Sequence, residues 1–592
     1  MVARAASLPF NGHVHSPDAQ AIPRHAPPPH RFTILAALSV VTACALGLRL
    51  AALANGLPFQ SDADAVIVTQ AMGLERGAPR SGALPISPLY PHLPALSLVA
   101  LPGEVVHQAP ADAPWESHAT AAAHPHLLAR RWLALLSTLA IPGAFFLARR
   151  FLSPAWALFA ACLLATSLLH LVFTRQARPH GPLTAATLWT LISAMHLARR
   201  PTCAASAACS VCTALAIGIL HSGTSILPIV ALASLIAAYR STGLARAACA
   251  LPLAAAYASF RLFYPFVGTH GVLATRKDLP NHVFDGSGFA AIARSCWSFD
   301  PVLTSLAAVG TLYACSLAWR RRRQHEPWCS SDVALVAAFA LPYLAVLGSY
   351  ARALHRFALP LTPVLALLGA AGAQVIVRTL ARRHSSATAQ GRTALLLAGV
   401  ALIPPSAAAL RWVWLSATPN SATIAARWVA ENTSPERETV AISAGLHLPL
   451  PCDPEGLETV PEYARSPMQR YLEEHPARPN PGPAYRLRTL IPLTDTGAAD
   501  IREESVADLL AELAPHYAVV TPPTNHAGQG DGTLAAIKAA GGVLVERIET
   551  YDVRGDFSIP RHRRGGSFGY EAFSLALRAK ARGRPIEIYR LP

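Results

Sequence analysis

Two aspartates directly after the first apolar segment are the residues whose type and spacing best fit acid–base chemistry. The segment over 32–54 is apolar, and shortly after it the chain reads Asp62-Ala63-Asp64. An ionised carboxylate beside a membrane helix is unfavourable unless it is solvated, paired or used. Either aspartate can accept a proton from a substrate hydroxyl, and the sequence leaves open which of the two does so.

A set of arginines at the outer ends of apolar segments complements the aspartates. Basic residues of membrane proteins normally gather on the cytoplasmic side, so outer arginines need a reason. The planar guanidinium donates two parallel hydrogen bonds and is the preferred partner of phosphate. One outer arginine usually anchors a helix at the lipid headgroups, and it is their occurrence together with two aspartates that indicates a phosphate site. The candidates are Arg49, Arg131, Arg175, Arg178 and Arg356.

The composition predicts a polytopic α-helical membrane protein. Of 592 residues, 52% are hydrophobic and only 14% are charged, whereas about a quarter are charged in soluble proteins. A spanning helix needs about 20 apolar residues, and the chain offers about 11 candidate segments. They lie at 32–54, 131–148, 154–173, 182–198, 204–220, 224–239, 246–264, 299–319, 333–350, 358–377 and 393–412.

The basic clusters between these segments predict the orientation of the chain. With the N-terminus in the cytoplasm, every cluster of this type, including Arg149-Arg150 and Arg320 to Arg323, falls on the cytoplasmic side. The net charge of +16 therefore signals topology and does not indicate a nucleic-acid partner. We expect a multi-pass protein of the inner (plasma) membrane, with Asp62 and Asp64 outside.

The composition also divides the chain into three parts. Residues 1–31, rich in Pro and His, predict a disordered cytoplasmic tail. Residues 32–412 form the membrane domain, with a first outer loop over 55–130. Residues 413–592 regain charge, Pro and Gly and predict an extracytoplasmic α/β domain that covers the site or contacts the acceptor. Within it we expect strands at 439–442 and 517–520 and helices at 422–430 and 534–540.

No pattern in the sequence indicates a metal or a cofactor. His124 and His126 lie near Arg130, but a His-Pro-His sequence in a loop is more often solvated than a metal ligand. Gly528-Gln529-Gly530 lacks the strand–turn–helix context of a phosphate-binding loop. We therefore expect neither a metal nor a cofactor.

The order of several short motifs resembles that of the GT-C glycosyltransferases. The match is to the branch that holds the protein O-mannosyltransferases and the bacterial aminoarabinose transferase of lipid A (glycosyltransferase family 39-like). Asp62-Ala63-Asp64 through Gly77 is similar to the acidic motif after the first helix, where the family usually has Asp-Glu. The other similar segments are Ser87 to Pro91, like PPLYP without its first proline, Ala129 to Leu133, Phe173 to Pro179, His355 to Pro363, Ala425 to Thr433 followed by Val440-Ala441, and Arg584 to Arg590.

The resemblance implies a GT-C-like inverting glycosyltransferase that needs no cofactor. Such an enzyme moves a sugar from a polyprenyl-phosphate donor to an acceptor hydroxyl on the outer face of the cytoplasmic membrane. Asp62 or Asp64 would be the base, and Arg131, Arg178 and Arg356 would hold the donor phosphate as it leaves. The implied partners are the lipid-linked sugar, an acceptor glycan, lipid or protein, and membrane lipids. An apolar segment at 86–101 would lie along the membrane surface beside the site.

Two other functions fit parts of the sequence. A lipid or glycan transporter, or flippase, would use intramembrane charge, and it predicts repeats, broken helices and charge near the midplane of the bilayer. A catalytically inactive membrane scaffold would bind a partner through its outer domain, and it predicts no dependence on Asp62 or Asp64.

Overall fold

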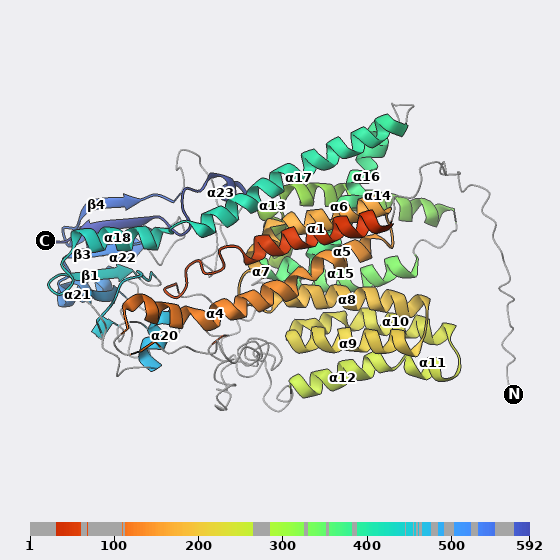
Figure 1. Ribbon diagram of the computed structural model, residues 1–592, viewed down its shortest axis with the longest axis horizontal. Coiled ribbons are helices and arrows are strands. Elements are labelled where there is room, and N and C mark those ends of the chain that lie inside the picture. Colours follow the sequence, from red (N-terminus) through yellow and green to blue (C-terminus); the bar gives the residue numbers. More distant parts are fainter. Residues whose placement is uncertain are drawn as a thin grey trace.

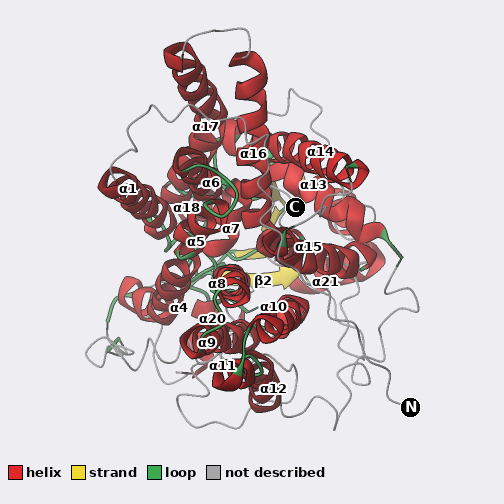
Figure 2. Ribbon diagram, turned by 90° about the vertical axis from the view of Figure 1, so that its right-hand side faces the viewer, coloured by secondary structure: helices red, strands yellow, loops and turns green. Residues whose placement is uncertain are grey.

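Helices that run side by side along the long axis build one end of the molecule in the computed structural model, and a small α/β domain forms the other end (Figure 1). Figure 2 looks along this axis, with the bundle seen end on and the sheet behind it. The structure describes residues 31–592 except 61–67, 69–108, 111–112, 265–284, 325–329, 351–353, 382–386, 444–445, 454, 457–459, 461–464, 475–483, 491–502, 523–530 and 551–572.

The predicted spanning segments are all helical, which confirms the polytopic fold class. By length and composition, eight helical segments within the described ranges are able to cross a membrane, or nine if the bent pair α6–α7 is one span. The helices are α1 (Arg31–Leu50), α4 (Trp115–Thr138), α5 (Ala140–Ala148), α6 (Pro154–Thr166), α7 (Leu168–Thr174), α8 (His180–Arg199), α9 (Cys203–Ile219), η1 (His221–Ile226), α10 (Leu227–Arg240), α11 (Gly243–Ala248), α12 (Leu251–Phe263), α13 (Ser287–Phe299), α14 (Pro301–Arg323), α15 (Ser331–Ser349), η2 (His355–Leu361), α16 (Thr362–Ala381) and α17 (Ala387–Ala417).

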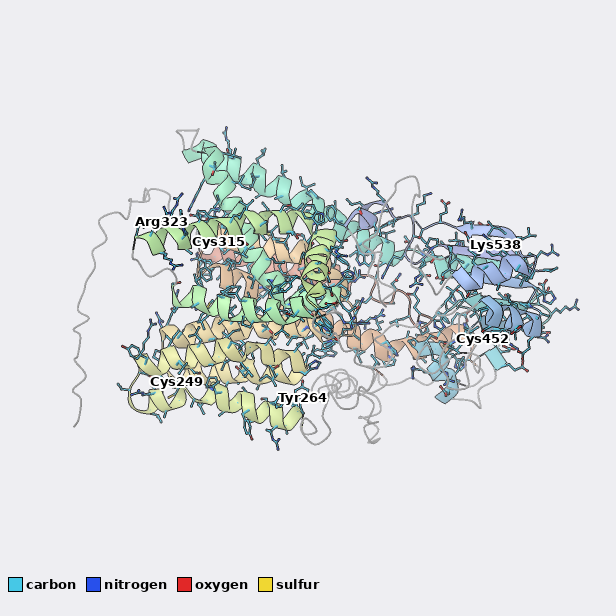
Figure 3. All side chains as sticks on the ribbon, turned by 180° about the vertical axis from the view of Figure 1, so that it is seen from behind. Cys249, Tyr264, Cys315, Arg323, Cys452 and Lys538 are labelled. Atoms are coloured by element: carbon cyan, nitrogen blue, oxygen red, sulfur yellow. The ribbon has the colours of Figure 1, made fainter. Side chains whose placement is uncertain are left out.

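The basic ends of the helices lie away from the α/β domain. Arg323, at the end of α14, lies at the opposite end of the molecule from Lys538 in the α/β domain (Figure 3). Arg199, at the end of α8, forms an ion pair with the buried Asp332 at the start of α15, with Nε–Oδ1 3.1 Å and Nη2–Oδ2 2.5 Å. The bundle therefore has one basic face, and the domain sits beyond the other.

The C-terminal part is a five-stranded sheet with helices on both faces. Its strand order is β2-β1-β3-β5-β4; β2, β1 and β3 are parallel, and β5 is antiparallel to β3 and β4. Alternate residues of a strand point to opposite faces, so α18 packs on one face and α21 and α22 pack on the other. The elements are α18 (Ser421–Asn432), β1 (Thr439–Ser443), α20 (Pro467–Glu474), β2 (Arg486–Leu490), α21 (Glu503–Leu513), β3 (Tyr517–Val520), α22 (Asp531–Ala539), β4 (Val543–Ile548), α23 (Phe573–Arg578) and β5 (Ile586–Arg590).

The strands and helices predicted after residue 413 are present at the predicted positions. The runs at 439–442 and 517–520 are β1 and β3, and both are buried. The predicted helices at 422–430 and 534–540 correspond to α18 and α22.

Helix α4 reaches from the bundle to the α/β domain and meets α20 there (Figure 1). It begins at Trp115, so the region expected as an outer loop over 55–130 contains its first turns. His124 and His126 belong to this helix, and the prediction of a loop there was wrong. The reason is tertiary: Trp115 packs in one apolar cluster with Met468 and Tyr471 of α20, and sequence periodicity does not reveal that partner.

A buried carboxylate stabilises the bend between α6 and α7. The two helices meet at 54° on either side of Ser167. Asp300, which precedes α14, accepts hydrogen bonds from Ser167 Oγ (2.6 Å) and from the amides of Leu168 (2.7 Å) and Leu169 (3.3 Å). The first amides of a helix have no partner within the helix itself, so Asp300 caps α7 and fixes its direction.

Residues 51–60, which we call the entry segment, lead from α1 towards the two aspartates. They form turns in which the amide of Leu57 donates to Ala54 O at 2.9 Å and the amide of Gln60 donates to Gly56 O at 2.7 Å. The segment stops just before residues outside the described ranges, and these include Asp62 and Asp64. The predicted surface segment 86–101 and the loop at 528–530 also lie outside them.

Candidate functional site

Two buried arginines from the bundle hold the entry segment. Arg175, directly after α7, donates a hydrogen bond from Nη2 to the carbonyl oxygen of Ala51. Arg130, on α4, donates from Nη1 to the carbonyl oxygens of Leu53 at 2.8 Å and Asn55 at 3.2 Å. The path of the chain towards the aspartates is therefore set by contacts to its backbone from two helices.

The side chain of Asn55 connects the entry segment to the end of α17 and to the α/β domain. Asn55 Nδ2 donates to the carbonyl oxygen of Ser416 at 2.8 Å. Arg582, just before β5, donates from Nη1 to Asn55 Oδ1 at 2.9 Å and to Ser416 Oγ at 3.2 Å. The guanidinium carbon of Arg582 also lies 4.4 Å from the centre of the Trp412 ring. Asn55 is thus the point at which three separate parts of the chain meet.

Four guanidinium groups crowd around this point, and we call Arg49, Arg130, Arg175 and Arg582 the inner cluster. Burial, and next the charges of Arg582, Arg130 and Arg49, lower the pKa of Arg175 to about 9. The hydrogen bonds described for Arg49 and Arg175 all go to neutral acceptors. Like charges held together in a buried place favour a nearby anion.

Arg49 is the most deeply buried member of the inner cluster. Its side chain is 0% exposed. It donates to the carbonyl oxygen of Ala45 at 2.8 Å and bonds Nδ1 of His170, on α7, at 2.8 Å. These contacts tie the end of α1 to α7. The Nε atom of Arg49 is buried and has no hydrogen-bond partner among the described residues.

A second pair of arginines, Arg178 and Arg356, lies beside His180 at the start of α8. The two guanidinium groups are close enough to interact electrostatically with each other and with His180. The ring of Phe357, in η2, lies near both groups. Its centre is 5.6 Å from the centre of the His180 ring and 5.2 Å from the guanidinium carbon of Arg356. Arg178 is buried and Arg356 is half-buried.

Polar atoms of this pair are available to a ligand. Nε of Arg356 and Nδ1 of His180 are buried, and neither has a hydrogen-bond partner among the residues that the structure describes. A buried polar group without a partner is unfavourable by about 1–3 kcal/mol, so a bound oxyanion would stabilise both. Two guanidinium groups beside an imidazole can hold one phosphate group.

The arginines predicted from the sequence fall into different places. Arg49 and Arg175 belong to the inner cluster, whereas Arg178 and Arg356 form the separate pair. Arg131 is exposed on α4 and joins neither group. Its neighbour Arg130 occupies the buried position instead, because adjacent residues of a helix point about 100° apart.

Three residues of the site were not predicted from the sequence. Asn55, Ser416 and Arg582 carry no motif, and they come together only through the packing of α17 and the α/β domain against the bundle. The region of Arg582 did carry one signal, since Arg584 to Arg590 resembles a closing strand, but a strand motif does not reveal a contact to Asn55. Within the described ranges, no group of three or more His, Cys, Asp or Glu is able to hold a metal ion.

Comparisons with known proteins give structural likenesses only. No family model and no curated protein match the chain in sequence. The chain is similar to the solved structure of the Archaeoglobus fulgidus oligosaccharyltransferase tethered with an acceptor peptide, at 13% identity and a TM-score of 0.49, over 86% of this chain and 72% of that chain. It is also similar to ArnT from Cupriavidus metallidurans bound to undecaprenyl phosphate, at 14% identity and a TM-score of 0.37, over 87% and 96% of the two chains. The likeness to both concerns the fold alone.

Proposed function

We propose that this protein is a membrane glycosyltransferase that moves a sugar from a polyprenyl phosphate to an acceptor hydroxyl. The observation that carries the proposal is the Arg178–Arg356 pair beside His180. Nε of Arg356 and Nδ1 of His180 are buried there without a hydrogen-bond partner among the described residues. The connection between α7 and α8 carries both Arg178 and Arg175, so it joins this pair to the cluster that holds the entry segment.

The proposed reaction is a displacement at the anomeric carbon with inversion. The acceptor oxygen forms a bond to that carbon while the bond from the carbon to the phosphate oxygen breaks. Asp62 or Asp64 takes the proton of the hydroxyl, and the polyprenyl phosphate leaves with the electron pair. Arg178 and Arg356 stabilise the negative charge on that phosphate, so the leaving group needs no general acid.

The other predicted arginines receive different roles in this proposal. Arg49 and Arg175 shape the site by holding α1, α7 and the entry segment. Arg131 is exposed, and no contact of the described residues supports its predicted role in phosphate binding.

We place the α/β domain on the outer face of the inner membrane. The basic helix ends would then face the cytoplasm, as in most membrane proteins. The Arg178–Arg356 pair would lie at the outer boundary, where a lipid-linked phosphate is accessible. Arg49, Arg175, Arg178 and Arg356 lie at or next to the ends of α1, α7, α8 and η2, whereas a transporter is expected to carry such charges near the midplane of the bilayer.

The test is sugar transfer by purified protein in lipid nanodiscs, with a panel of radiolabelled polyprenyl-phosphate sugars and a cell-envelope fraction as the acceptor. We expect incorporation by the wild type and a loss of at least tenfold in Arg178→Ala and Arg356→Ala. Arg294→Ala, which removes an exposed arginine of α13, is the matched control and should keep wild-type activity. Equal incorporation by all four proteins, or none by the wild type with any sugar, would contradict the proposal.

A further inference from the structure

We propose that Arg582 is a positioning residue for the catalytic base, so that the α/β domain is a working part of the active site. The inference rests on the proposed function, because it concerns the entry segment, which directly precedes Asp62 and Asp64 in the sequence. It does not require Arg582 to touch a substrate. It requires that Arg582 keep the entry segment in one conformation.

Among the described residues, two hydrogen bonds join the α/β domain to the entry segment. Arg582 donates to Asn55 Oδ1 at 2.9 Å. The backbone amide of Met468, on α20, donates to the carbonyl oxygen of Pro58 at 3.0 Å. The second contact lies near the end of the entry segment, just before the chain continues to Asp62. Both contacts come from outside the bundle, so the bundle alone does not complete the support of this segment.

The backbone at Arg582 is itself firmly placed. Its carbonyl oxygen accepts a hydrogen bond from the amide of Ser421, at the start of α18, at 2.8 Å. The next residue is Gly583, with φ of +105°, and a Cβ atom there would lie 2.1 Å from Ser421 Oγ. Only glycine fits this close approach. Arg411 on α17 donates to the carbonyl oxygen of Ala579 at 3.0 Å and holds the same stretch from the other side.

The guanidinium group of Arg582 is also held by α17. It lies over the Trp412 ring and donates to Ser416 Oγ, and both residues belong to the last turns of α17. The geometry that it transmits to Asn55 therefore comes from α17 and α18 together. Arg582 therefore holds Asn55, and with it the entry segment, in one position relative to α17.

Catalysis by a general base is sensitive to such placement. A shift of about 1 Å in a reacting group is able to lower the rate about 100-fold. A positioning residue should therefore affect kcat much more than the affinity for the donor lipid, which the Arg178–Arg356 pair binds. A lower kcat with an unchanged donor affinity distinguishes a positioning role from a general loss of structure.

The experiment compares Arg582→Met, Asn55→Ala and the double variant with the wild type. Methionine keeps the length of the side chain and removes both the hydrogen bonds and the charge that lies over Trp412. Arg590→Ala, which removes an exposed arginine of β5, is the control. We expect kcat to fall roughly 10- to 100-fold in each single variant, with the KM for the donor unchanged. The kcat of the double variant should be no lower than that of the less active single variant, because the two residues act as one unit.

A second measurement does not depend on activity. Amide hydrogen exchange of the peptide that covers residues 51–60 should become faster in Arg582→Met and stay unchanged in Arg590→Ala. If the wild type transfers no sugar, the proposed function fails, and hydrogen exchange still decides whether Arg582 holds the segment. Unchanged exchange of this peptide in Arg582→Met, or faster exchange spread equally over the whole α/β domain, would overturn the inference.

Discussion

Arg582 donates a hydrogen bond of 2.9 Å to Asn55, and the two residues are 527 positions apart in the chain. This contact joins the last strand region of the α/β domain to the turn that follows the first helix. The α/β domain therefore helps to hold the entry segment in place.

The Arg178–Arg356 pair should bind the phosphate of the donor lipid. Each arginine removed takes away charge-assisted hydrogen bonds of about 1.5–3 kcal/mol, which corresponds to roughly 10- to 100-fold in Kd. We expect that weakening for undecaprenyl phosphate in Arg178→Ala and Arg356→Ala, measured by titration in nanodiscs. Arg131→Ala should change Kd much less, since Arg131 is exposed; an equal effect of all three would show that the pair is not the phosphate site.

Asp300 should contribute to stability through its cap on α7. Asp300→Ala leaves Ser167 and the first amides of α7 without their acceptor, at a cost of about 1–3 kcal/mol for each buried group that stays unsatisfied. We expect a clearly lower midpoint of thermal unfolding, and a smaller decrease in Asp300→Asn, which keeps one acceptor oxygen. Asp508→Ala, at an exposed position of α21, is the control. A midpoint for Asp300→Ala equal to that of the control would show that the cap does not stabilise α7.

The orientation of the chain predicts which cysteines react in intact cells. A membrane-impermeant maleimide should label Lys538→Cys, at an exposed position of α22, from outside. It should label Cys203, exposed at the start of α9, only after the cells are opened. Labelling of Cys203 in intact cells together with protection of Lys538→Cys would reverse the topology.

Cys452, in the same domain, should stay unreactive at pH 8 even though it lies on the accessible side. Burial, and next the charge of Asp453, raise the pKa of its thiol to about 12. The thiol is then almost fully protonated at pH 8, and only the thiolate reacts. Alkylation followed by mass spectrometry should find Cys452 modified after denaturation and unmodified in the folded protein. Rapid modification of the folded protein at pH 8 would contradict this placement.

The helices and two of the strands were predictable from the sequence because burial in lipid or in a sheet leaves long apolar runs. The arrangement of the arginines was not predictable to the same degree. Arg130 and Arg131 are adjacent and chemically identical, and only the rotation of α4 in the folded protein decides which one is buried. The contact between Asn55 and Arg582 depends on how an entire domain packs on the bundle, and the helical start of α4 depends on α20. Local sequence carries no record of such long-range partners.

The central claim is that a carboxylate after the entry segment acts as the base, and sugar transfer by Asp62→Asn and Asp64→Asn tests it most directly. Asparagine keeps the size of the side chain and removes its ability to accept a proton at neutral pH. We predict that at least one of the two variants loses transfer by 100-fold or more, a loss typical of general-base catalysis, while it still binds undecaprenyl phosphate like the wild type. Full turnover by both variants would contradict the account.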